Sequence, residues 1–176
     1  RSFGGGTVVG WTPDGKILFR TSQYNGLPSP QLATLADDNT ITLIPLSQAY
    51  EGSYSADGKT LFFARRPPNF SLAKRYQGGL AQTLWKFTMG MEAVPLSADY
   101  PGTSERPMVW EGRVYFQSDR GGSMNLWSMD QAGKNLKQHT RHSGFDVRQA
   151  NLREGKIVYQ MGSDIYLYDI ASGADR

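Results

Sequence analysis

The chain consists of short apolar runs that alternate with polar turns rich in glycine, aspartate and glutamate. The run Lys156-Ile157-Val158-Tyr159 is typical, because its last three residues are β-branched or aromatic and would place apolar side chains on both faces of a strand. A strand that is apolar on both faces lies between two packed layers. Since no stretch keeps an apolar period of 3.6 residues, the pattern predicts an all-β protein.

One such run recurs four times together with the turn that precedes it. The copies are residues 11–19, 54–62, 109–116 and 152–159. Their shared glycines lie 43, 54 and 43 residues apart, at Gly15, Gly58, Gly112 and Gly155. Glycine adopts a positive φ without steric strain, so an acidic residue followed by glycine favours a tight hairpin. A repeat of about 40–45 residues made of strands and turns is typical of a β-propeller blade.

The repeats predict a single β-propeller segment over residues 1–176, with about four blades of four-stranded antiparallel sheets. In the second unit the four strands are expected at residues 50–55, 60–64, 83–88 and 92–96. The expected blades cover residues 7–47, 48–98, 104–142 and 145–176, and the last of them is incomplete. Closed propellers usually have about four to eight blades. We therefore expect the segment to belong to a larger ring of about six or seven blades.

The longer second interval comes from an insertion at residues 65–79, between the second and third strands of the second unit. Paired prolines end one strand and paired glycines precede the next. Insertions in repeat proteins form loops on one rim, often the working face. Arginine and lysine there can bind a carboxylate through charge-assisted hydrogen bonds. The predicted substrate-binding residues are Arg65, Arg66, Lys74, Arg75 and Tyr76. The alternative interpretation is a solvated loop or a contact with another domain.

Several phrases together resemble the N-terminal β-propeller of tricorn-like serine proteases, of peptidase family S41. The insertion phrase Lys74-Arg75-Tyr76-Gln77-Gly78-Gly79 followed by Leu84-Trp85 is the most specific of them. Residues 11–16, 49–53, 114–120 and 125–127 add to the resemblance, which covers nearly the whole chain. The Asp-Gly-Lys phrase alone is less specific, because TolB-like propellers and other blades with PD40 or WD40-like repeats share it.

The resemblance implies a large parent protease that trims oligopeptides, with its catalytic domain outside this chain. The segment itself is then expected to be non-catalytic, to scaffold the protease, and to gate or guide oligopeptides toward that catalytic domain. The expected partners are peptides or other domains of the parent. The alternative is a TolB-like periplasmic propeller that binds other proteins. The family favours a cytoplasmic location, and the alternative a periplasmic one.

The residues themselves offer no catalytic or metal centre. No Gly-x-Ser-x-Gly motif occurs, the chain has no cysteine, and its only two histidines, His139 and His142, belong to one expected outer strand and loop. We therefore predict no catalytic residue, no metal site and no cofactor, with a structural or solvent-exposed role for the histidines.

Composition and the blade pattern add expectations about partners and packing. The net charge of +3 is too small for a dedicated nucleic-acid binder, and no apolar run is long enough to span a membrane. The four tryptophans fall in or beside expected strands, so they are expected to pack between blades; they are Trp11, Trp85, Trp110 and Trp127. Outer blade faces left uncovered would expose apolar surface, which predicts self-association.

Overall fold

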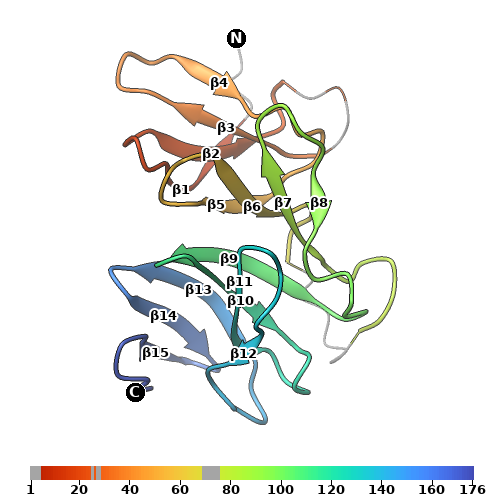
Figure 1. Cartoon of the computed structure of the whole chain (residues 1–176), viewed down its shortest axis with the longest axis vertical. Coiled ribbons are helices and arrows are strands. Elements are labelled where there is room, and N and C mark those ends of the chain that lie inside the picture. The colour runs from red at the N-terminus through yellow and green to blue at the C-terminus, as the bar shows by residue number, and fades with distance from the viewer. Residues whose placement is uncertain (1–4, 25, 27–28, 69–75) are drawn as a thin grey trace.

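The computed structural model describes residues 5–24, 26, 29–68 and 76–176. These residues form fifteen strands and no helix, so none of the described segments is a helix able to cross a membrane. The strands form four separate antiparallel sheets, each built from strands that follow one another along the chain (Figure 1). The predicted all-β architecture of about four blades is confirmed.

Each sheet is a blade, numbered here in chain order. Blade 1 contains β1 (Gly6–Trp11), β2 (Ile17–Thr21), β3 (Gln31–Leu35) and β4 (Ile41–Leu43). Blade 2 contains β5 (Glu51–Tyr54), β6 (Thr60–Ala64), β7 (Leu84–Thr88) and β8 (Val94–Pro95). Blade 3 contains β9 (Ser104–Trp110), β10 (Arg113–Ser118), β11 (Asn125–Asp130) and β12 (Lys137–Gln138). Blade 4 contains β13 (Val147–Arg153), β14 (Lys156–Met161) and β15 (Asp164–Asp169).

The last residues of the chain begin to pair with the outer strand of blade 4. Asp175 forms an isolated antiparallel bridge with Tyr168. The backbone N–H of Leu167 donates to the carbonyl of Arg176 at 2.7 Å, and the N–H of Arg176 donates to Leu167 at 3.2 Å. These bonds lie where a fourth strand of this blade would run.

The apolar cores lie between blades. Leu18 and Leu32 of blade 1 pack with Leu61, Phe63 and other residues that face them from blade 2. A second core joins blades 2 and 3, and contains Phe62, Ala64, Leu84, Val114, Phe116 and Met129. A third joins blades 3 and 4, and contains Met108, Tyr115, Leu126, Val147, Ala150, Ile157, Tyr159 and Tyr168. The middle strands are therefore apolar on both faces, as strands between packed layers must be.

The turns that join the first two strands of each blade are of two kinds. In blades 3 and 4 only two residues, Glu111-Gly112 and Glu154-Gly155, connect the strands, and all four have positive φ. Such angles define a type I′ hairpin. Blades 1 and 2 use longer turns, and a hydroxyl group closes each of them. Thr12 Oγ1 accepts the backbone N–H of Lys16 at 2.9 Å, and Ser55 Oγ accepts that of Thr60 at 3.0 Å.

These turns define one rim of the propeller, which we call the turn rim. The turns after β9 and β13 lie at the left of Figure 1, whereas the chain that leads into β7 lies at the right. Strand β6 runs between the two sides, with Gly58 before it and Arg65 after it. We call the side of Arg65 the insertion rim.

Candidate functional site

Two arginines stand at the insertion rim, directly after β6. The Arg65 guanidinium donates to Gln48 Oε1 at 2.9 Å and lies 5.1 Å from the centre of the Trp85 ring. Arg66 donates to the backbone carbonyl of Gly79. Both side chains are exposed. A guanidinium has several N–H donors, so each arginine keeps donors for a ligand such as a carboxylate.

The base of the insertion is tied to blade 3. Gln82 donates to the carbonyl of Pro67 at 2.9 Å and to Glu105 Oε2 at 3.2 Å, which bridges the two ends of the insertion and the inner strand β9. Tyr76 is half-buried, and its ring folds back over Gly78. Of the predicted binding residues, the structure thus brings Arg65, Arg66 and Tyr76 to one rim. Lys74 and Arg75 lie outside the described residues.

A serine and a histidine meet in blade 3, although not as a nucleophile and base. Ser128 Oγ lies 2.8 Å from His139 Nε2, and His139 Nδ1 lies 2.9 Å from the Tyr168 hydroxyl. Ser128 is fully buried and accepts two further hydrogen bonds from Arg113, at 3.1 and 3.0 Å. Burial lowers the pKa of His139 to about 4, with Lys137 and Arg113 adding to the effect. A neutral, half-buried histidine that bridges blades 3 and 4 is a structural group.

The second histidine holds the end of blade 4. His142 Nε2 lies 2.7 Å from the Tyr159 hydroxyl and 3.0 Å from Asp175 Oδ2. The Tyr159 hydroxyl donates to the other oxygen of Asp175 at 2.6 Å. Across the part of the chain that the structure describes, no group of three or more histidines and carboxylates could hold a metal ion.

The sequence analysis did not identify two buried carboxyl groups near the inner strands. Glu51 is 7% exposed and accepts the backbone N–H of Arg106 at 2.7 Å. Glu105 is 6% exposed and faces Gln82. Burial, with a smaller contribution from the nearby carboxylate of Glu51, raises the pKa of Glu105 to about 8 against the opposing effect of Arg106. Burial also raises the pKa of Glu51.

Glu51 belongs to a set of polar side chains that complete bulged inner strands. The bulge in β9 places Arg106 at φ 52°, and Glu51 of blade 2 accepts its N–H. The bulge in β13 places Gln149 at φ 53°. There, Gln117 of blade 3 donates to the carbonyl of Val147 at 2.9 Å and accepts the N–H of Ala150 at 2.8 Å. Blades are thus joined by hydrogen bonds as well as by apolar contact.

The tryptophans divide into two groups. Trp85, Trp110 and Trp127 are half-buried and pack against the shared cores, as expected. Trp11 is 69% exposed, because it lies on the face of blade 1 that points away from blade 2. The expectation that Trp11 packs between blades is therefore wrong for the chain described here.

The chain matches a protein-family model described as the tricorn protease N-terminal beta propeller domain, over residues 3–174. A tricorn protease homolog of Saccharolobus solfataricus is 38% identical over 161 residues, which cover 92% of this chain and 13% of the relative. The tricorn protease of Thermoplasma volcanium is 28% identical over 164 residues, which cover 92% of this chain and 15% of the relative. The chain thus spans a small part of the length of these relatives.

Solved structures show the same fold. The crystal structure of the tricorn protease superposes with a TM-score of 0.83 at 22% identity, over 97% of this chain and 17% of that one. TolB from Acinetobacter baumannii superposes with a TM-score of 0.72 at 18% identity, over 98% of this chain and 43% of that one. Because the family model covers almost every residue, we conclude that this chain belongs to the tricorn protease N-terminal β-propeller family.

Proposed function

We propose that this chain is a non-catalytic propeller segment of a tricorn-like serine protease, which scaffolds the enzyme and guides oligopeptides toward a catalytic domain outside this chain. The observation that carries the proposal is the family match over residues 3–174. The relatives' names describe proteases, and this chain spans 13% and 15% of the two relatives compared above. A segment of that size leaves ample length for a catalytic domain elsewhere in such a parent.

The insertion rim supplies the chemistry for guiding a peptide. Arg65 and Arg66 are neighbouring exposed cations at the end of one rigid strand. Arg65 is oriented by Gln48 and by the Trp85 ring, so it loses less conformational freedom when it binds a carboxylate. The free C-terminal carboxylate of an oligopeptide is the group that such a pair recognises.

This role is tested by peptide binding to the 176-residue chain. An oligopeptide with a free C-terminal carboxylate is expected to bind about fivefold more tightly than the same peptide as its C-terminal amide. The Arg65→Gln/Arg66→Gln variant should remove this difference. The Arg153→Gln/Lys156→Gln variant is the control, because it removes two exposed cations at the turn rim. Equal affinity for the acid and the amide in the unmodified chain would contradict the proposal.

The second candidate is a TolB-like propeller that binds folded protein partners, and TolB from Acinetobacter baumannii shares the fold. At 18% identity this likeness concerns the fold alone. The same titration separates the two candidates, since a module for folded partners has no need to distinguish a peptide acid from its amide.

We also infer that the chain self-associates through the outer faces of its first and last blades. Val8 and Trp11 are 66% and 69% exposed on the face of blade 1 that points away from blade 2. Ile165 and Val158 are 70% and 42% exposed on the far face of blade 4. Apolar side chains gathered on such faces favour association.

Replacing Trp11 and Ile165 by serine is expected to shift the chain toward the monomer in sedimentation velocity experiments. The matched control is Phe145→Ser, since Phe145 is 68% exposed in the connection between blades 3 and 4 and lies on neither outer face. A chain that sediments as a monomer at every accessible concentration would refute this inference.

A further inference from the structure

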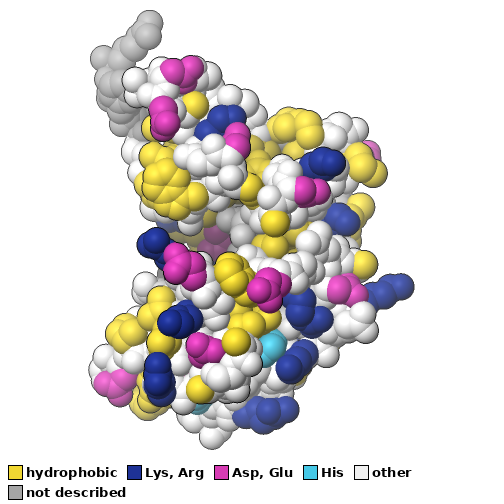
Figure 2. Space-filling view, turned by 60° about the vertical axis from the view of Figure 1, so that its left-hand side comes forward, with side chains coloured by type: hydrophobic (Ala, Val, Ile, Leu, Met, Phe, Trp, Pro, Cys, Tyr) yellow, Lys and Arg dark blue, Asp and Glu magenta, His cyan; other side chains and the backbone are white. Residues whose placement is uncertain are grey.

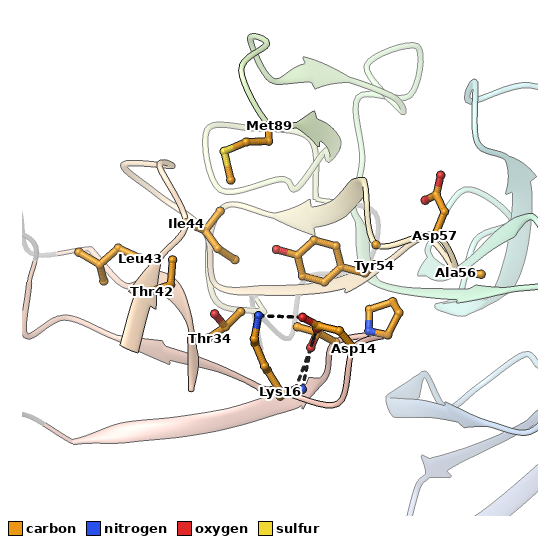
Figure 3. A pocket seen from close by; sticks show the side chains of 13 residues that line it. Asp14, Lys16, Thr34, Thr42, Leu43, Ile44, Tyr54, Ala56, Asp57 and Met89 are labelled. Atoms are coloured by element: carbon orange, nitrogen blue, oxygen red, sulfur yellow. Dashed lines mark hydrogen bonds and ion pairs between the residues drawn. The ribbon is translucent and has the colours of Figure 1, made fainter. Parts of the chain in front are cut away.

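A cleft of about 520 Å³ opens between blades 1 and 2 at the turn rim (Figure 3). Five segments line it: the turn of blade 1, Thr34 of β3, the end of β4, the turn of blade 2, and Met89 from the turn that follows β7. A volume of this size is within the usual range for ligand sites, about 300–1,000 Å³. The cleft and the arginines of the insertion rim lie toward opposite ends of β6.

One part of the cleft is acidic. Asp57 Oδ1 accepts the Ser55 hydroxyl at 2.6 Å and the N–H of Lys59 at 3.1 Å, whereas no donor from the described residues reaches its Oδ2. Asp14 Oδ2 pairs with the Lys16 ammonium at 2.7 Å. Hydrogen bonds from Lys16 and Thr12 lower the pKa of Asp14, and those from Ser55 and Lys59 lower the pKa of Asp57. Both carboxylates are therefore ionised at neutral pH.

The rest of the lining is largely apolar. In Figure 3 Leu43 and Ile44 lie on the side of the cleft opposite Asp57, the ring of Tyr54 lies between them and Asp57, and Met89 lies above. Met89 is 65% exposed and Leu43 is 38% exposed. Methionine adapts its shape to a partner because its unbranched side chain has several rotatable bonds. Figure 2 views the molecule from the side of the turns and shows apolar side chains exposed beside acidic and basic ones.

The lining chemistry selects among ligands. Among the described residues that line the cleft, Lys16 is the only cation, and it is already paired with Asp14, so an anion would meet the carboxylates without a free positive partner. A lysine or arginine side chain fits both parts, because its aliphatic stem covers apolar surface while its charged end reaches a carboxylate. The stem would lie over Tyr54 and the charged end would reach Asp57 Oδ2, while apolar neighbours in the peptide would contact Leu43 and Met89.

We propose that this cleft binds a basic side chain, lysine or arginine, of an extended oligopeptide whose neighbouring residues are apolar. The proposal rests on the proposed function only in taking oligopeptides as the ligands. It assigns to the turn rim a preference for internal basic residues, which is separate from recognition of the terminal carboxylate at the insertion rim. Asp14 and Asp57 thereby gain a second role besides forming the repeated turns.

The test uses the 176-residue chain and capped peptides, so that no terminal charge contributes. The probe is acetyl-Ala-Leu-Lys-Leu-Ala-amide, compared with the same peptide carrying norleucine in place of lysine. Binding is followed by chemical shifts of backbone amides in a ¹⁵N-labelled chain. We expect shifts at Gly15, Gly58 and Met89, an affinity at least about fivefold higher for the lysine peptide, and weaker binding at high salt.

Variants make the outcome decisive. Asp57→Asn keeps an oxygen that can accept from Ser55 and Lys59 but removes the charge, and should weaken binding of the lysine peptide about fivefold. Met89→Ala should also weaken it, and its exposed position makes it a second test should Asp57→Asn fail to fold. Glu111→Gln, at the exposed turn of blade 3, is the matched control and should leave the affinity for the lysine peptide unchanged.

Three results would overturn the proposal: equal binding of the norleucine peptide, equal binding by the Asp57→Asn chain, or shifts confined to residues away from the cleft. The Arg65→Gln/Arg66→Gln variant should bind the capped lysine peptide as the unmodified chain does. A loss of carboxylate recognition at the insertion rim and a loss of binding in the cleft are therefore separate outcomes.

Discussion

Replacing Glu105 by glutamine should remove a large part of the loss of stability that the chain undergoes between about pH 5 and pH 8, while Glu51, whose pKa is also raised, contributes the rest. The pKa of the Glu105 carboxyl group rises from its ordinary value of 4.5 to about 8 in the folded chain, chiefly because the group is buried. The folded state therefore keeps a proton that the unfolded state has lost, and the free energy of unfolding falls as the pH rises through this window. Above about pH 8 the variant should be more stable by about 3–5 kcal/mol.

The measurement is urea unfolding of both chains at a series of pH values. Glutamine preserves the shape of the side chain and an oxygen that can accept from Gln82, so the two chains should be nearly equally stable at about pH 5. Glu111→Gln provides the control, since it removes an exposed carboxylate from the same blade. Parallel stability curves for the unmodified and Glu105→Gln chains would show that Glu105 ionises without cost in the folded state.

Replacing Gln117 by leucine should destabilise the chain by about 2–4 kcal/mol. The Gln117 amide is 1% exposed and satisfies the carbonyl of Val147 and the N–H of Ala150, which the bulge in β13 leaves without partners in the neighbouring strand. Leucine has a similar volume but would leave both buried backbone groups without hydrogen bonds. Each such group costs about 1–3 kcal/mol.

The next blade offers a matched control for this change. Gln160 occupies the equivalent position in blade 4, because it lies as far after Gly155 as Gln117 lies after Gly112. Gln160 is half-buried and donates to the carbonyl of Gly162 in an exposed setting. Gln160→Leu should therefore change the free energy of unfolding by less than about 0.5 kcal/mol. Thermal or urea unfolding that found the two variants equally stable would rule out a bridging role for Gln117.

The fold could be predicted because it depends on patterns that are local in sequence. Each blade is a run of consecutive strands, and the acidic-glycine turns mark where the first hairpin bends. The glycine is nevertheless an imperfect register mark. The paired strand resumes at Ile17, Leu61 and Arg113, which lie two, three and one residues after their glycines. Turns of different length place the same phrase in different registers, and the sequence pattern does not reveal this.

The polar groups between blades could not be predicted in the same way. Gln117 finds its partners 30 and 33 residues away, and Glu51 finds its partner 55 residues away, in strands whose bulges have no clear sequence signature. The cleft at the turn rim was also missed, although Asp14 and Asp57 belong to the repeated phrase. Aspartate before glycine indicates a turn, and the sequence does not show that two of these turns and apolar side chains from both blades line one cleft. The insertion was recognised from its charge, since Arg65 and Arg66 need no distant partner to be noticed.

Sharing each core between two blades has a consequence for how the chain comes apart. No blade holds a complete core of its own, so the smallest unit able to fold cooperatively is a pair. Stability then behaves as a sum of nearest-neighbour couplings along a one-dimensional array. Unfolding should begin at the end blade that interacts more weakly with its neighbour and proceed toward the centre of the chain. Residues in the core shared by blades 2 and 3 should be the last to exchange their amide hydrogens.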